Sequence, residues 1–120
     1  MTHEKSKLIA QQNDEFRKNI SCTHTKSKIT GSYSMTEGVL ALSSFDRLDA
    51  VLKIKAYDNF NENNDPHGEH DCGRFQLESN KQDIIWKIYY YDTNYKYGSE
   101  DPSDLSKTRR VLTVMLPSEY

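Results

Sequence analysis

The residues with the widest chemical capacity lie at positions 64–73, where the chain reads N-D-P-H-G-E-H-D-C-G. Two imidazoles and three carboxylates fall within seven positions: Asp65, His67, Glu69, His70 and Asp71. An imidazole with a carboxylate can bind a divalent metal ion, or it can act as a base that the carboxylate orients. These five residues are therefore a candidate binding surface, and they are also the candidate ligands or catalytic groups of a metal-dependent hydrolase.

The spacing of these groups matches no established metal motif. His67 and His70 are three residues apart, whereas the H-E-x-x-H zinc helix needs a spacing of four. Pro66 and Gly68 favour a loop rather than a helix, and Pro66 also stands where a calcium loop requires its turn glycine. Two interpretations stay open, a loop whose side chains cap backbone groups and a metal or catalytic centre. The spacing favours the first.

Cysteine chemistry is equally incomplete. The chain has two cysteines, which we expect to be reduced thiols. A zinc site can be written from His67, His70 and Cys72 with Cys22 or His24 as the fourth ligand, but it lacks the paired cysteine spacings of known zinc sites. The sequence also has no G-x-S-x-G nucleophile elbow and no glycine-rich phosphate loop. We therefore predict no cofactor, except an unidentified divalent metal in the hydrolase alternative.

Tyrosines and acidic residues form a second candidate surface. Its members are Trp86, Tyr89, Tyr91, Tyr95, Tyr97, Glu100 and Asp101, with Arg109 and Arg110 further along the chain. Aromatic side chains supply large contact area at low entropic cost, which suits a protein partner. Stacking of nucleic-acid bases is the alternative, with phosphates held by basic residues: Lys87, Lys96, Lys107, Arg109 and Arg110. Acidic residues at 92–104 would repel phosphates, so we expect Lys107, Arg109 and Arg110 to pair within the fold.

Length and composition limit the remaining possibilities. A chain of 120 residues, 28% charged and 35% hydrophobic, suits one domain, which we assign to residues 1–120. A net charge of −2 and a pI near 6.1 give no strong field for phosphates or anionic lipids. No apolar stretch reaches the roughly 18 residues of a membrane span, and the polar start predicts no signal peptide. We therefore expect a cytoplasmic protein that does not bind membranes.

Hydrophobic periodicity predicts the elements that hold these residues in place. Residues 5–20 and 43–57 have the period of amphipathic helices, and 29–35, 74–77, 84–91 and 109–116 read as strands. The second helix is expected to bury one stripe formed by Phe45, Leu48, Val51 and Leu52. Residues 58–71 and 92–106 are polar loops. This order predicts an α+β fold, with two helices packed on a mostly antiparallel sheet of about four strands.

The strand at 84–91 has the strongest strand character in the chain. Ile84, Trp86 and Ile88 share one of its faces, while Tyr89 and Tyr91 lie on the other. Because both faces carry large groups, we expect this strand to be central in the sheet and covered, at least partly, on both sides.

At these segments the sequence resembles the bacterial proteins grouped as domain of unknown function 3768. The matching blocks are N-D-P-H-G-E-H-D-C-G at 64–73, W-K-I-Y-Y-Y-D at 86–92, Y-G-S-E-D-P-S-D at 97–104 and T-R-R-V-L-T-V-M-L at 108–116. The resemblance implies a prokaryotic protein, often encoded on plasmids or other mobile elements, and makes interference with a host system a reasonable expectation. Two positions depart from the family pattern, since an aromatic is expected at Cys72 and an aspartate at Tyr89.

Together these observations predict a non-enzymatic protein-binding module. Because proteins of the family that the sequence resembles are often encoded on mobile elements, we also expect it to inhibit a host defence system. Two alternatives remain. One is a small metal-dependent hydrolase that uses His67, Glu69, His70 and Asp71, and the other is a nucleic-acid-binding protein. The sequence leaves the partner and the oligomeric state open.

Overall fold

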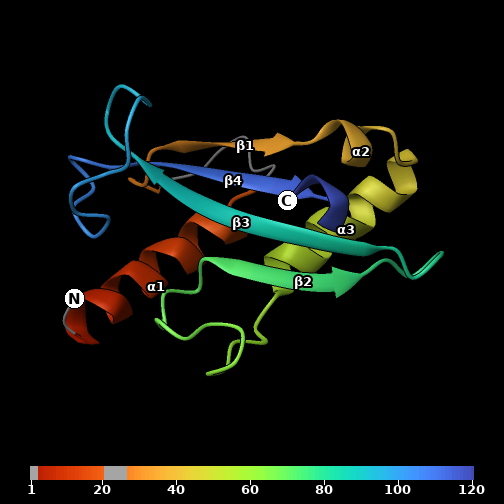
Figure 1. Cartoon of the computed structure of the whole chain (residues 1–120), viewed down its shortest axis with the longest axis horizontal. Coiled ribbons are helices and arrows are strands. Elements are labelled where there is room, and N and C mark those ends of the chain that lie inside the picture. The colour runs from red at the N-terminus through yellow and green to blue at the C-terminus, as the bar shows by residue number, and fades with distance from the viewer. Residues whose placement is uncertain (1–2, 21–26) are drawn as a thin grey trace.

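The chain folds as a four-stranded sheet with helices packed behind it (Figure 1). The computed structural model describes residues 3–20 and 27–120. Its helices are α1 (His3–Lys18), α2 (Glu37–Leu40), α3 (Ser44–Ala56) and the 3₁₀ helix η1 (Pro117–Glu119). Its strands are β1 (Gly31–Met35), β2 (Cys72–Gln76), β3 (Asp83–Tyr91) and β4 (Arg109–Met115). The predicted α+β class is confirmed, and the short α2 and η1 are additions to it.

The sheet has the order β1-β4-β3-β2, so β4 and β3 form its centre. β3 pairs antiparallel with β2 and with β4, whereas β1 runs parallel to β4. Gly31 in β1 lies opposite Arg110, and a Cβ atom there would collide with the Arg110 carbonyl and with the Phe16 ring. Glycine at this position therefore lets α1 pack closely on the edge strand.

One face of the sheet is covered by α1 and α3, which contact each other and extend toward opposite ends of the sheet in Figure 1. Trp86, Ile88, Leu112 and Val114 point toward the helices and are almost fully buried. The helices contribute Phe16, Ala50 and Ile54 to the same core. Removing this apolar surface from water is the main force that holds the helices on the sheet.

The opposite face of the sheet, called the open face below, is left uncovered by α1 and α3. The ladder places Tyr89 beside Val111 and Tyr91 beside Arg109 on this face. All four side chains are half-buried, whereas Ile85 at the far end is buried. β3 is therefore central, and its second face is covered in part, both as predicted.

The prediction that Phe45, Leu48, Val51 and Leu52 of α3 form a buried stripe is wrong. Only Val51 of the four residues is buried, and the exposed fractions of Phe45, Leu48 and Leu52 are 69%, 56% and 56%. The helix instead turns Ala50, Val51 and Ile54 toward the core. α3 thus has two apolar stripes, and the one with smaller and β-branched side chains packs on the sheet.

α1 buries polar residues together with apolar ones. Ile9 and Phe16 are in contact with the interior as the periodicity predicts, but Asn13 and Arg17 are also at most 2% exposed. Buried polar groups need hydrogen-bond partners, so these two residues indicate a polar network beneath the helix. Across residues 3–20 and 27–120, no helix is both long and apolar enough to cross a membrane.

Candidate functional site

The 58–71 loop is held by its own side chains. Asp65 is 9% exposed, and its carboxylate accepts hydrogen bonds from the backbone N–H of Glu69 at 3.1 Å and of His70 at 3.2 Å. Asn61 Oδ1 caps the backbone N–H groups of Asn63 and Asn64 in the same way. For Asp65 the capping interpretation made from the sequence therefore holds.

His70 joins this loop to α1. Its Nδ1 atom donates to the Asp14 carboxylate at 3.0 Å, and its ring stacks on Phe60 with centroids 3.9 Å apart. Its Nε2 atom lies 3.9 Å from an oxygen of Asp65. The backbone of His70 has a φ of 55°, in the left-handed region that non-glycine residues seldom adopt. The fold therefore holds this imidazole in a fixed orientation between two carboxylates.

The side chain of Glu69 points toward the face of the sheet that the helices cover. Its Oε1 atom accepts from the Tyr90 hydroxyl at 2.9 Å, and its backbone carbonyl accepts from Asn13 Nδ2 at 2.9 Å. Asn13 Nδ2 also donates to the Tyr90 oxygen at 2.8 Å. Burial raises the pKa of the Tyr90 hydroxyl, so this group remains a proton donor to Glu69. Glu69 is thus a structural acceptor whose position Asn13 and Tyr90 fix.

Arg110 completes the network and cannot meet a partner, although the sequence placed it on the second candidate surface. It is fully buried, and its Nε atom donates to Asn13 Oδ1 at 2.7 Å. One terminal nitrogen donates to Gln12 Oε1 at 2.9 Å and to the carbonyl of Pro102 at 3.1 Å, while the guanidinium lies over the Tyr90 ring. Burial lowers the pKa of Arg110. Arg110 therefore serves to tie β4 to α1.

A second buried arginine, Arg17, braces the other end of the 58–71 loop. Its Nη2 atom donates to Asp14 at 3.2 Å and to the Tyr57 carbonyl at 2.9 Å, and its guanidinium lies over the rings of Phe60 and Trp86. The same Asp14 carboxylate thus receives both Arg17 and His70. The sequence analysis missed Gln12, Asn13, Asp14 and Arg17. The sequence signal for Asn13 and Arg17 was their spacing: they follow Ile9 at intervals of four residues, which places them on the buried stripe of the helix.

The remaining candidate ligands do not join this cluster. His67 is exposed, and Asp71 is half-buried, with its backbone carbonyl accepting from the N–H of Ile88 at 2.7 Å. A hollow of about 360 Å³ lies beside the loop and is lined by His3, Phe60, Asp65, His67 and His70, among others. In the described part of the chain, no group of three or more His, Cys, Asp or Glu side chains is arranged to hold a metal ion.

The zinc set that included a cysteine is not supported at Cys72. This residue is a free, half-buried cysteine, and burial raises the pKa of its thiol, which disfavours the thiolate that a metal or an electrophile needs. The proposed fourth ligands, Cys22 and His24, lie outside the described residues.

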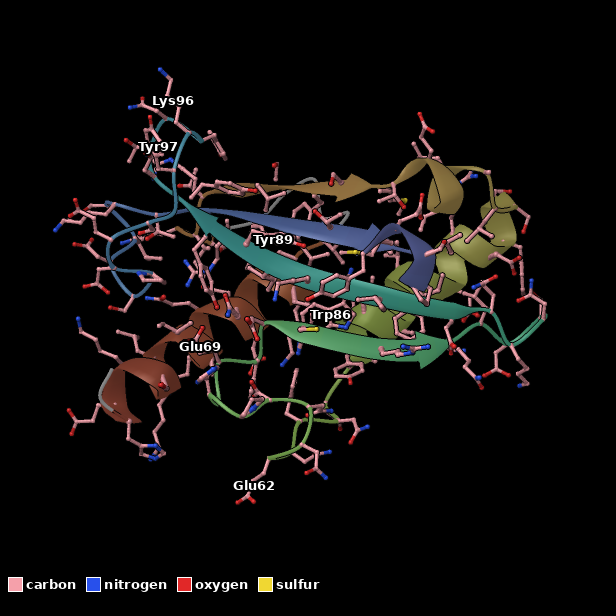
Figure 2. All side chains as sticks on the ribbon, in the orientation of Figure 1. Glu62, Glu69, Trp86, Tyr89, Lys96 and Tyr97 are labelled. Atoms are coloured by element: carbon pink, nitrogen blue, oxygen red, sulfur yellow. The ribbon has the colours of Figure 1, made fainter. Side chains whose placement is uncertain are left out.

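The tyrosine surface divides into buried and exposed members. Trp86 is fully buried beneath the sheet and cannot touch a partner, contrary to our expectation. Tyr89, Tyr91 and Tyr95 form a row, with ring centroids 6.5 Å and 6.3 Å apart along it. Figure 2 shows Tyr97 with Lys96 at the tip of the 92–106 loop, far from Glu69 and beyond the end of the sheet. Tyr95 and Tyr97 are 48% and 75% exposed.

The acidic residues of the 92–106 loop mostly bind their own backbone. Asp101 accepts from the Ser103 N–H at 3.1 Å and the Ser103 hydroxyl at 2.6 Å, and Asp104 accepts the same pair of bonds from Ser106. These serine hydroxyls hold the pKa of each carboxyl below its usual range. Glu100 is exposed and lines a hollow of about 450 Å³ with Asp92, Tyr97 and Lys107. Glu100 is therefore freer to meet a partner than Asp101.

The predicted pairing of the basic residues with these acids does not occur among the described residues. Arg109 donates only to the carbonyls of Leu105 and Thr108, and Arg110 binds neutral groups. Lys87, Lys96 and Lys107 likewise form no ion pair in the part of the chain that the structure describes. Lys87 lies instead over the Tyr89 ring, 5.7 Å from its centroid. Lys96 and Lys107 are exposed, so their charged ends can meet an external group.

The fold and the site define a small α+β domain with one open sheet face and a polar loop that is locked to its first helix. A family model described as a protein of unknown function, DUF3768, matches residues 35–119. The chain belongs to this family. No curated protein and no solved structure matches it. The matched part contains the 58–71 and 92–106 loops, whereas α1, which braces both loops, precedes it.

Proposed function

We propose that this chain is a non-enzymatic protein-binding module, which contacts its partner through the open face and the 92–106 loop. The observation that carries the proposal is the row of tyrosine rings from Tyr89 through Tyr91 to Tyr95. The same loop also carries Tyr97, whose side chain is exposed. Tyrosine is enriched where proteins bind one another, because it combines a large apolar ring with a polar tip. The exposed Glu100 and Lys107 add charges at the rim of this surface.

The contacts of the 58–71 loop also favour binding over catalysis. Of its chemically capable side chains, Asp65 caps the backbone, Glu69 accepts from Tyr90, and His70 is held by Asp14. Groups that fix a loop in this way give it a rigid shape, which lowers the entropic cost of binding. The exposed tip around His67 would then extend the surface without performing chemistry.

We further propose that the partner belongs to a host defence system, which the module inhibits. The support is the resemblance of the 64–73, 86–92 and 97–104 segments to bacterial proteins often encoded on mobile elements. Such elements survive when host systems that would destroy them are blocked, and a small module without its own catalytic set can block by occupying a surface.

The test is capture of a partner by tagged protein from bacterial cells, with and without the substitutions Tyr95→Ala and Tyr97→Ala in one chain. We expect the wild type to recover one partner in stoichiometric amount and the double variant to lose most of it. The matched control is Leu8→Ala, which removes an exposed apolar side chain on α1. Because all three side chains are exposed, melting temperatures should stay close to that of the wild type. Equal capture by the double variant and the control would exclude this surface.

Single-stranded nucleic acid is a second candidate ligand for the open face. The specific observation is that Lys87 and Arg109 lie on this face beside Tyr89 and Tyr91, and neither cation is paired with an acid among the described residues. Aromatic rings with nearby cations can stack bases and hold phosphates. Fluorescence anisotropy with labelled oligonucleotides should then give binding that weakens with salt and with Lys87→Glu. Binding that is absent, or indifferent to both, would remove this candidate.

A further inference from the structure

The stripe formed by Phe45, Leu48 and Leu52 on α3 is exposed, although these side chains are apolar. It is a second exposed surface of the molecule, separate from the tyrosine surface. Phe45, Leu48 and Leu52 follow one another at intervals of three and four residues, so they form one continuous apolar seam over two turns. Each is more than half exposed. Single exposed apolar residues are normal, but three large ones in a row along a helix mark an interaction surface.

We propose that a second copy of this chain covers the α3 stripe, with the two α3 helices packed antiparallel across a twofold axis that passes between Leu48 and Leu52. This inference does not depend on the function proposed above. The stripe lies on the side of α3 away from its buried residues Ala50 and Ile54, and hence away from the sheet and its open face.

The sizes of the side chains favour this arrangement. With the axis midway along the stripe, Leu48 of one copy meets Leu52 of the other, at the centre of the seam. At each end, Phe45 then falls near Ala56 of the other copy, which is exposed and small. A large ring opposite a small residue fills the space that two like residues would crowd or leave empty. A parallel pair would set Phe45 against Phe45.

The charges of α3 favour the same direction. Its first half carries Asp46, Arg47 and Asp49, and its last turn carries Lys53 and Lys55. An antiparallel pair therefore brings the more acidic half of each helix to the basic end of the other. The two helix dipoles then oppose each other favourably as well. Asp49 and Lys53 form an ion pair at 3.4 Å on one flank of the stripe. Lys53 also binds Glu78 at 3.1 Å, so this pair is held within its own copy.

The expected association is weak and concentration-dependent. Stable dimers commonly bury roughly 800 Å² on each partner, which is more than three side chains of one helix supply, so we expect a dissociation constant on the order of micromolar. The pairing is isologous, and it would leave both open faces accessible. A dimer of this form would present two copies of the tyrosine surface, so a partner with repeated sites would bind it with avidity.

Sedimentation velocity over protein concentrations from about 1 µM to about 1 mM tests the association, since that range spans the expected constant. The mass should rise from 14.0 kDa toward twice that value. Leu48→Asp should stay monomeric throughout, whereas the matched control Leu8→Asp should dimerise like the wild type. Because both leucines are exposed, circular dichroism should confirm that both variants remain folded. A wild type that stays monomeric, or a Leu48→Asp variant that dimerises equally, overturns the proposal.

Disulfide trapping tests the direction of packing. In a background with Cys22→Ser and Cys72→Ser, Leu48→Cys and Leu52→Cys chains are mixed and oxidised. The antiparallel seam predicts that mixed 48–52 crosslinks form faster than the crosslinks within either single population. Faster 48–48 and 52–52 crosslinks would indicate parallel helices and would contradict the arrangement, even if the protein dimerises.

Discussion

The 58–71 and 92–106 loops are both long, polar and rich in carboxylates, and α1 contacts both of them. It contacts the first through side chains with chemical capacity, since Asp14 binds His70 and Asn13 binds Glu69. It contacts the second through one backbone group and one surface ion pair, since Gln12 donates to the Ser103 carbonyl and Lys5 lies 3.3 Å from Asp101. The reactive side chains of the first loop therefore form the hydrogen bonds that fix that loop. In the second loop, Tyr97 and Glu100 remain exposed to solvent.

The comparison shows why two loops of similar composition differ in the exposure of their side chains. A carboxylate or imidazole next to a buried polar helix is drawn into that helix's hydrogen bonds, because an unsatisfied buried group costs more free energy than the loop gains by leaving it free. Asn13 and Arg17 create that demand beneath the 58–71 loop. The 92–106 loop satisfies its backbone locally, with Asp101 and Asp104, and so its aromatic residues stay free.

The largest effect should come from Asn13→Ala, which removes the residue that connects Arg110, Tyr90 and Glu69. The buried Arg110 and the half-buried Tyr90 and Glu69 lose hydrogen bonds at once, so the free energy of unfolding should fall by about 3 kcal/mol. Chemical denaturation measures this change. The control Gln11→Ala replaces an exposed residue of the same helix and should stay within about 0.5 kcal/mol of the wild type. A loss below about 1 kcal/mol for Asn13→Ala would mean that the network is not what locks the loop.

A smaller and more local effect is expected from His70→Ala. This change removes the bond to Asp14 and the stacking on Phe60, so stability should fall by roughly 1–2 kcal/mol. Hydrogen exchange should rise across residues 58–71 and stay unchanged across 92–106. His67→Ala is the matched control, because it alters an exposed histidine of the same loop and should be almost neutral. If both histidine variants lose the same stability, the contacts of His70 with Asp14 and Phe60 do not stabilise the loop.

The 92–106 loop should respond to acid through Asp101 and Asp104. Both carboxyls have a pKa below the ordinary value in the folded protein, chiefly because Ser103 and Ser106 hydroxyls donate to them. Their stabilising contribution is therefore present above the unfolded pKa of about 3.9, and it is lost as the pH falls through the folded value.

The corresponding variant is Asp101→Asn with Asp104→Asn, compared with the wild type by urea denaturation at several pH values. We expect the variant to be slightly less stable at neutral pH, and the difference to shrink as the pH falls below about 3.9. A difference that is constant with pH would assign the loss to altered turn geometry and not to the carboxylate charges.

The smallest effect is expected from divalent metals. Three of the candidate ligands, Asp65, Glu69 and His70, already make structural hydrogen bonds. We therefore expect zinc, manganese or calcium to leave the melting temperature unchanged relative to protein in chelator. A ligand that binds the folded state must raise that temperature, so a reproducible shift that His67→Ala abolishes would revive the metal-dependent alternative.

The sequence by itself determined the two long helices, the strands and the two polar loops. Strand and helix periods located β3, β4 and both long helices, and glycine, proline and asparagine at 58–71 marked a loop, because these preferences act over a few neighbouring residues. The family blocks pointed to the same loops. Asp65 as a backbone cap was also within reach, since the N–H groups that donate to it lie four and five residues away.

Only the tertiary structure decided which faces are buried and which polar groups meet. Periodicity groups Phe45, Leu48 and Leu52 on one side of α3, but it cannot say which of two apolar stripes will find the sheet. The bond between Asn13 and Tyr90 joins residues 77 positions apart, and the bond between Asp14 and His70 spans 56. Such pairs form because burial of the whole core brings them together and then penalises any donor left unpaired, and no local pattern carries that information.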